Sequence, residues 1–247
     1  MKPKVVILSG YGLNCEDETK YAFDLAGGIG HIVHINDLIK NKKLLNNFQI
    51  MAIPGGFAYG DDTGSGNAYG LKLRNHLWEQ ISTFVSKDRL ILGICNGFQV
   101  LVNLGLVGER QVALLPNDSH RYTTGWFDIT ITNDSPWLTG ITEIALPIAH
   151  GEGKFYASSD ILKQLNKKNL VAARYVVNPT GTLENIAAIT DESKRILGIM
   201  PHPERAMFFT QLPDWPYLKE LYQRQGKQVP TQGPGLRIFQ NAVRYFQ

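Results

Sequence analysis

The sequence predicts an α/β fold, with an open and mostly parallel twisted sheet, helices on both faces and antiparallel additions. In the first part of the chain, short apolar runs alternate with segments of helical spacing, the pattern of parallel strands joined by helices. Later, apolar and polar residues alternate over residues 127–131, which is typical of an antiparallel strand with one exposed face. The chain has 247 residues and no clear linker, so we expect a single domain spanning residues 1–247.

The composition is that of an ordinary globular protein and argues against several functional classes. Hydrophobic residues make up 43% of the chain and charged residues 19%, which suits a packed core. The net charge of +3 is not gathered into a basic stripe, so no nucleic acid partner is expected. No apolar run suits a membrane span or a signal peptide. Two cysteines cannot form a disulfide framework, and the expected location is cytoplasmic.

Strands and helices are expected to alternate up to Gly105, where the pattern changes. The first helix should begin after Asn14, a good N-cap followed by three acidic residues, and end at Gly27 and Gly28. The other elements expected in this part are strands at 5–8, 31–35, 50–53 and 90–94, and helices at 38–45, 73–85 and 98–102.

The second part is expected to extend the sheet with antiparallel strands. Strands in this part are predicted at 127–131, 145–150, 171–176, 186–190 and 196–200, the last two joined by a turn at 191–194. Residues 211–235 are rich in Pro and Gly and are predicted to form an ordered surface loop. The chain should close with a helix on which Phe239, Val243 and Phe246 share a face.

Cys95 is the candidate nucleophile. It lies between Gly93 and Gly97, where a predicted strand turns into a predicted helix. Gly-x-Cys-x-Gly in this position is the thiol form of the nucleophile elbow, whose tight turn requires small residues on either side. The helix N-terminus favours the thiolate. The alternative is a buried cysteine that only packs, but the two glycines favour the nucleophile.

A glycine pair, Gly55 and Gly56, follows the strand predicted at 50–53. In an open α/β sheet, ligands bind outside the carboxyl ends of the strands, and glycines there let backbone N–H groups approach a ligand closely. Alone, the pair could be a tight turn. It matches neither a dinucleotide-binding fingerprint nor a P-loop.

Two H-x-E pairs compete for the roles of base and orienting partner: His150 with Glu152, and His202 with Glu204. Residues two apart in an extended segment point to the same side, so either glutamate could hold its histidine. Each pair could equally be a loop hydrogen bond, and spacing does not choose between them. No metal is expected, because neither H-E-x-x-H nor a following Cys-x-x-Cys is present.

Longer motifs resemble those of the class I (triad) glutamine amidotransferases. The general likeness is carried by Gly93-Ile-Cys-Asn-Gly-Phe-Gln99 and Met200-Pro-His-Pro-Glu204. More narrowly, Pro54-Gly-Gly-Phe-Ala-Tyr-Gly-Asp61 and Ala149-His-Gly-Glu-Gly153 resemble the glutaminase subunits of phosphoribosylformylglycinamidine synthases. The likeness spans nearly the whole chain.

The resemblance implies a flavodoxin-like class I amidotransferase fold with Cys95 as nucleophile, His202 as base and Glu204 as its partner. The residues that it places around the substrate and its oxyanion are Gly55, Gly56, Phe57, Asn96, Gln99, His150 and Gly151. It implies hydrolysis of L-glutamine to glutamate and ammonia. The ammonia would pass to a synthase subunit that makes phosphoribosylformylglycinamidine from formylglycinamide ribonucleotide in purine biosynthesis.

The resemblance also implies the partners. No cofactor is expected in this chain, whereas the large synthase subunit would use ATP and Mg²⁺, often with a small bridging subunit. The loop at 62–66, Gly125 and the long segment after Ala206 depart from the family pattern, outside the triad.

Two alternatives remain. A DJ-1/PfpI-type cysteine hydrolase has a similar elbow, but that group commonly carries His directly after the cysteine, where this chain has Asn96. A catalytically idle, regulatory glutaminase-like subunit would have no reason to keep all three triad residues together.

Overall fold

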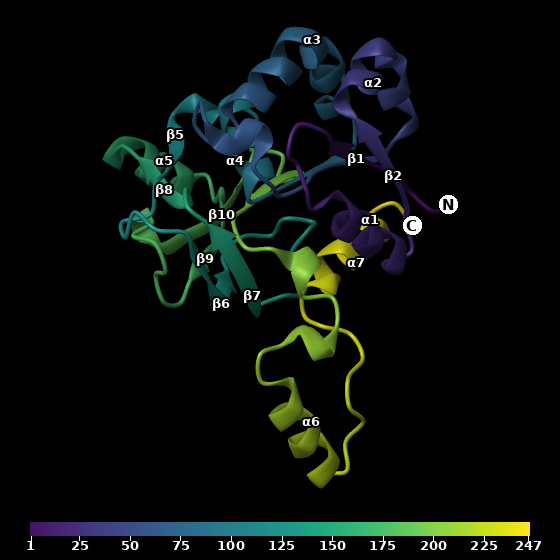
Figure 1. Cartoon of the computed structure of the whole chain (residues 1–247), viewed down its shortest axis with the longest axis vertical. Coiled ribbons are helices and arrows are strands. Elements are labelled where there is room, and N and C mark those ends of the chain that lie inside the picture. Colours follow the sequence, from purple (N-terminus) through teal and green to yellow (C-terminus); the bar gives the residue numbers. More distant parts are fainter.

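The computed structural model describes residues 1–247 and is organised around a nine-stranded sheet (Figure 1). The strand order is β2-β1-β3-β4-β11-β10-β9-β6-β7. Its strands are β1 (Lys4–Ser9), β2 (Ile29–His34), β3 (Ile50–Ile53), β4 (Leu90–Ile94), β6 (Thr123–Ile131), β7 (Glu143–His150), β9 (Val171–Tyr175), β10 (Ile186–Thr190) and β11 (Ile196–Ile199). A separate antiparallel pair joins β5 (Val112–Leu115) to β8 (Lys154–Ala157).

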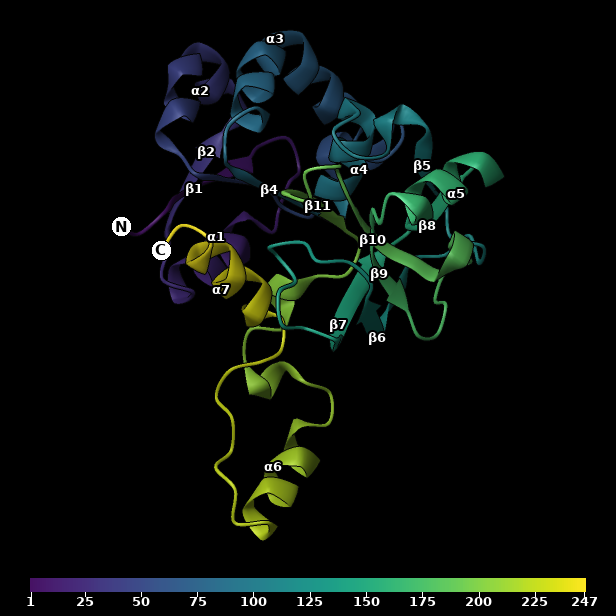
Figure 2. The same cartoon turned by 180° about the vertical axis from the view of Figure 1, so that it is seen from behind.

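Helices cover both faces of the parallel part, as Figure 2 shows. The helices are α1 (Glu16–Leu25), α2 (Ile35–Lys40), α3 (Asn67–Val85), α4 (Asn96–Leu104), α5 (Ser159–Lys167), α6 (Trp215–Arg224) and α7 (Leu236–Arg244). On one face α1 packs against α7, with the rings of Phe23 and Phe239 edge to face at 4.9 Å. On the other face lie α2, α3 and α4. Strands β3 and β4 are buried throughout, which explains their uninterrupted apolar sequences.

The predicted mixture of parallel and antiparallel strands is confirmed. Strands β1, β2, β3, β4 and β11 pair in parallel, whereas β10, β9, β6 and β7 extend the sheet in antiparallel fashion. The extension curls back toward the parallel strands. The N–H of His202, just after β11, shows this by donating to Pro147 O in β7 at 2.8 Å. The last strand of the order therefore lies beside the carboxyl edge of the parallel strands.

Three local predictions are wrong. Asn14 does not cap α1: the N-cap is Cys15, without a side-chain bond, while the Asn14 N–H donates to Gly55 O. The second helix begins early, at Ile35, because His34 Nδ1 accepts the N–H of Asn36 and caps it; a 3₁₀ turn at Lys42–Asn47 follows. Residues 211–235 contain helix α6. Pro216 lies in its first turn, where a missing N–H loses no hydrogen bond, so the proline does not prevent the helix.

No helix in the structure combines the length and apolar character needed to cross a membrane.

Candidate active site

The elbow around Cys95 has the geometry that its glycines predict. Cys95 joins β4 to α4 with φ +50° and ψ −105°, a conformation that non-glycine residues rarely adopt. A Cβ on Gly97 would lie 1.8 Å from Ile53 O, and one on Gly93 would lie 2.6 Å from Gly97 O. Glycine is therefore required at both positions, and the Cys95 side chain is held at the amino end of α4, only 5% exposed.

The parallel pairing of β4 and β11 brings His202 to Cys95. Ile94 and Ile199, the last residues of the two strands, lie opposite each other, and the Cys95 N–H donates to Ile199 O at 2.8 Å. The segments that follow both strands therefore leave the same edge of the sheet. His202 Nδ1 lies 2.6 Å from Glu204 Oε1, and both side chains are buried. The carboxylate accepts the Nδ1 proton, which leaves Nε2 as the basic nitrogen.

The charges around His202 favour its protonated form. Burial by itself lowers the pKa of His202, but the Glu204 carboxylate and then the Cys95 and Cys15 sulfurs more than offset this, so the pKa lies well above its ordinary value. His202 Nε2 has no other hydrogen-bond partner in the protein. A buried imidazolium beside a thiol can stabilise the thiolate and later supply a proton.

The glycine pair after β3 lies directly against the histidine. A Cβ on Gly55 would be 2.8 Å from His202 Cε1, and one on Gly56 would be 2.5 Å from Gly12 O. The Gly56 N–H donates to no backbone acceptor. The Asn96 N–H is the first of α4, a position without an intrahelical acceptor. These two N–H groups are the candidate oxyanion donors.

Phe57 requires a correction. Its backbone N–H donates to Gly12 O at 2.9 Å and holds the glycine loop to the loop after β1, so it is not a free oxyanion donor. The Phe57 ring instead lies on the surface, 6.0 Å from the Tyr122 ring.

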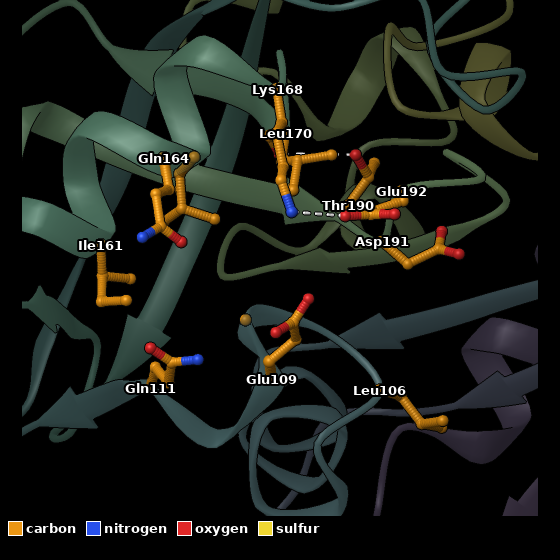
Figure 3. Close-up of a pocket in the computed structure, with 12 residues that line it drawn as sticks. Leu106, Glu109, Gln111, Ile161, Gln164, Lys168, Leu170, Thr190, Asp191 and Glu192 are labelled. Atoms are coloured by element: carbon orange, nitrogen blue, oxygen red, sulfur yellow. Dashed lines mark hydrogen bonds and ion pairs between the residues drawn. The ribbon is translucent and has the colours of Figure 1, made fainter.

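Gln99 and Asn96 belong to a polar network on the other side of the elbow. Asn96 Nδ2 donates to Gln99 Oε1 at 2.8 Å and to Asp61 Oδ1 at 3.1 Å, while Gln99 Nε2 donates to Glu152 O at 2.6 Å. A cavity of about 290 Å³, lined in part by Gln99, Asn103 and Glu152, adjoins this network. A second cavity, of about 260 Å³ (Figure 3), lies beyond the far end of α4 and contains none of the predicted residues.

His150 does not pair with Glu152, which distinguishes the two H-x-E pairs. Asn117 Nδ2 is surrounded by three acceptors, and Asn117 Oδ1 accepts the Gly153 N–H. Asn117 Oδ1 is therefore the acceptor, and His150 Nδ1, 3.2 Å away, carries the proton. The Glu152 carboxylate instead accepts the N–H of Ser65. Burial, and then the charge of His202, lowers the pKa of His150 to about 4. His150 is thus a neutral residue whose buried Nε2 has no partner, and Gly151 follows it, its carbonyl bound by the Asn117 N–H.

Comparison with known proteins agrees with this geometry. Residues 2–246 match the model of the CobB/CobQ-like glutamine amidotransferase domain. The chain belongs to this amidotransferase family.

Full-length relatives narrow the likeness. The phosphoribosylformylglycinamidine synthase subunit PurQ of Methanococcus maripaludis is 44% identical over 99% of this chain and 97% of its own length. That of Dehalococcoides mccartyi is 41% identical over 99% of this chain and 98% of its own. In the solved structure of PurLQS from Thermotoga maritima, one chain is 29% identical, has a TM-score of 0.76 and is matched over 100% of both chains. These likenesses favour an amidotransferase over a DJ-1/PfpI-type hydrolase.

Sequence reasoning missed Cys15 and Arg205 as part of this amidotransferase site. Arg205 Nη2 donates to Cys15 Sγ at 3.0 Å, and ligand atoms of Cys15, His202 and Glu204 all lie within 4.8 Å of one another. The guanidinium beside the sulfur disfavours a divalent cation there. The available signal was position, since Cys15 follows the carboxyl end of the first strand, the edge where Cys95 lies.

Proposed function

We propose that this chain is the glutaminase subunit of a phosphoribosylformylglycinamidine synthase. It would hydrolyse L-glutamine to glutamate and ammonia and deliver the ammonia to the subunit that converts formylglycinamide ribonucleotide to the amidine in purine biosynthesis. The observation that carries the proposal is the buried His202–Glu204 pair beside the Cys95 elbow. The full-length similarity to PurQ subunits is the reason for placing this activity in purine biosynthesis.

In the first half-reaction, the Cys95 proton passes to His202 Nε2, and the thiolate attacks the carboxamide carbon of glutamine. The oxygen of the tetrahedral intermediate becomes an oxyanion, which the N–H groups of Gly56 and Asn96 would hold. Each such donor is typically worth about 3 kcal/mol of transition-state stabilisation. His202 then donates its proton to the nitrogen as the C–N bond breaks, releasing ammonia and leaving a γ-glutamyl thioester on Cys95.

In the second half-reaction, water attacks the thioester carbonyl, and His202 takes its proton. The tetrahedral intermediate collapses with cleavage of the C–S bond, and the proton returns to the sulfur as glutamate leaves. Glu204 holds the imidazole in one orientation throughout. Gln99, Gly151 and the neutral His150 would contact the glutamine and fix its position.

Ammonia released into water at neutral pH becomes ammonium, which is not a nucleophile, so this site benefits from passing ammonia directly to a partner. We assign that role to a large synthase subunit, together with a small bridging subunit. ATP and Mg²⁺ belong to that synthase subunit, because no phosphate-binding loop occurs in this chain. We assign the protein to the cytoplasm, where reducing conditions keep a thiol nucleophile active.

Replacing the nucleophile tests the proposal. In the assembled complex, Cys95→Ser should abolish glutamine-dependent amidine synthesis, while synthesis from added ammonium chloride continues. A glutamine-analogue diazoketone should label the wild-type chain at Cys95 alone, as read by peptide mass. Glutamine-dependent synthesis that survives in the variant would refute the triad. Absence of labelling would favour an idle regulatory subunit.

A further inference from the structure

Residues 211–232 project from the body of the protein as a distinct arm, here called the α6 arm (Figures 1 and 2). Not one of these residues is buried, and the helix that they contain, α6, packs mainly against the adjoining 3₁₀ turn at Phe209–Gln211. It includes most of the long segment after Ala206 that stands out in the sequence.

The root of the arm is closed by backbone hydrogen bonds. The Phe209 N–H donates to Thr231 O at 3.1 Å, and the Gly233 N–H donates to Met207 O at 2.7 Å. A Cβ on Gly233 would lie 2.5 Å from Ala206 O, so the two strands of the root touch along their backbones. These contacts fix the place where the arm leaves the body of the protein, shortly after Glu204 in the sequence.

Helix α6 has two apolar faces with different environments. Trp215, Leu218 and Tyr222 are half-buried, and the ring of Tyr222 packs edge to face on Phe209 at 6.1 Å. Tyr217 and Leu221, one turn apart, lie on another side of the helix and are 68% and 37% exposed. The inner face holds the arm together, whereas Tyr217 and Leu221 remain exposed on the outer one.

An ordered arm without buried residues gains little from its own packing to offset the conformational entropy lost in forming it. An aromatic and an aliphatic side chain one helical turn apart are the pattern of a helix that binds in an apolar groove of another protein. Basic residues (Lys219, Arg224 and Lys227) and acidic residues (Asp214 and Glu220) are nearly balanced along the arm, so apolar contact rather than net charge should dominate its binding.

We propose that the α6 arm docks its Tyr217–Leu221 face into an apolar groove of the large synthase subunit, the subunit that receives the ammonia. This inference rests on the proposed function. Ammonia formed at Cys95 must leave at the carboxyl edge of the sheet, so the receiving subunit must face that edge. The arm begins six residues after Arg205, the last residue of the 3₁₀ turn that carries Glu204, so it leaves the chain close in sequence to the triad. It is therefore placed to hold the partner beside the site of ammonia release.

Removing the outer face without disturbing the inner one tests the proposal. The full-length chain carrying Tyr217→Ser and Leu221→Ser is titrated by calorimetry against the cognate large subunit, with the small subunit present. The matched control, Lys219→Ser and Gln223→Ser, makes the same number of serine substitutions on another side of the same helix. Loss of two interface anchors should weaken the Kd by roughly 30-fold or more, whereas the control should stay within about threefold of wild type.

Further measurements distinguish failure of the docking proposal from failure of the proposed function. Labelling of Cys95 by the diazoketone should be equal in all variants, and Tyr217→Phe with Leu221→Met should restore binding if side-chain contact is the cause. Equal affinity of wild type and the serine variant would overturn the docking role and leave the proposed function standing. Self-association of the chain through the same face, seen by light scattering and lost in the serine variant, would also overturn it. Failure of the wild-type chain to bind the synthase at all would reject both proposals.

Discussion

At the scale of single residues, the site depends on one strained backbone conformation and one buried hydrogen bond. The positive φ of Cys95 costs free energy that the surrounding sheet and helix must offset. In return, the sulfur is held at the start of α4, next to a histidine oriented by Glu204. Contacts of single residues also distinguish His202, which pairs with a carboxylate, from His150, which does not. Sequence spacing could not make this distinction.

His202→Ala should reduce the kcat of glutamine hydrolysis in the complex by roughly 10²–10⁴-fold, because the variant loses both proton acceptor and donor. His150→Ala should act mainly on the KM for glutamine, since His150 is neutral and bound to Asn117 rather than to a carboxylate. Steady-state kinetics of both variants provide the comparison. A larger loss of kcat in His150→Ala would mean that the other H-x-E pair is catalytic.

Glu204→Gln should shift the pH dependence of activity. The carboxylate raises the pKa of His202 against the opposing effect of burial. Since His202 must donate a proton to the departing ammonia, activity is lost as pH rises through this raised pKa. Without the carboxylate the pKa falls, so the alkaline limb of the kcat profile should move to lower pH. Glu220→Gln on the exposed α6 arm is the control, and identical alkaline limbs in both variants would contradict this role.

At the scale of elements, the strand-to-helix turn tolerates almost no added volume. Gly97→Ala places a methyl group 1.8 Å from Ile53 O, so β3 or α4 must move. We expect a loss of at least about 3 kcal/mol in the free energy of unfolding, measured by urea titration. Gly151→Ala is the control, because its Cβ would meet nothing closer than Tyr122 Cδ2 at 3.9 Å. Equal stability of the two variants would show that the turn relaxes easily.

At the scale of the whole molecule, the curled antiparallel extension completes the site. Strand β7 is last in the sheet order, yet its Pro147 carbonyl accepts the His202 N–H and the Ala149 carbonyl lies 3.8 Å from Cys95 Sγ. His150, at the end of the same strand, is thereby buried near the triad. Its depressed pKa is a consequence of this global arrangement rather than of its sequence neighbours.

That burial predicts acid sensitivity of the whole fold. The unfolded chain binds a proton at His150 near pH 6.5, whereas the folded chain resists it until about pH 4. The contribution of neutral His150 is therefore present above pH 6.5 and is lost as pH falls towards 4, by roughly 3 kcal/mol. His150→Gln should remove this part of the pH dependence, measured as the difference in unfolding free energy between pH 7.5 and pH 4. An unchanged difference would contradict the burial of a neutral His150.

The sequence by itself determined the fold class, most strands and the elbow, because apolar periodicity and the glycines around Cys95 report local requirements. It misplaced the cap of α1 by one residue. It also predicted a loop at 211–235, because Pro and Gly residues indicate turns even where a short helix lies between them. Only the tertiary structure decided which histidine pairs with a carboxylate, and that the Phe57 N–H is already bound. Those outcomes depend on which strands adjoin and how the sheet curls. Such contacts join residues far apart in the chain, and local patterns do not encode them.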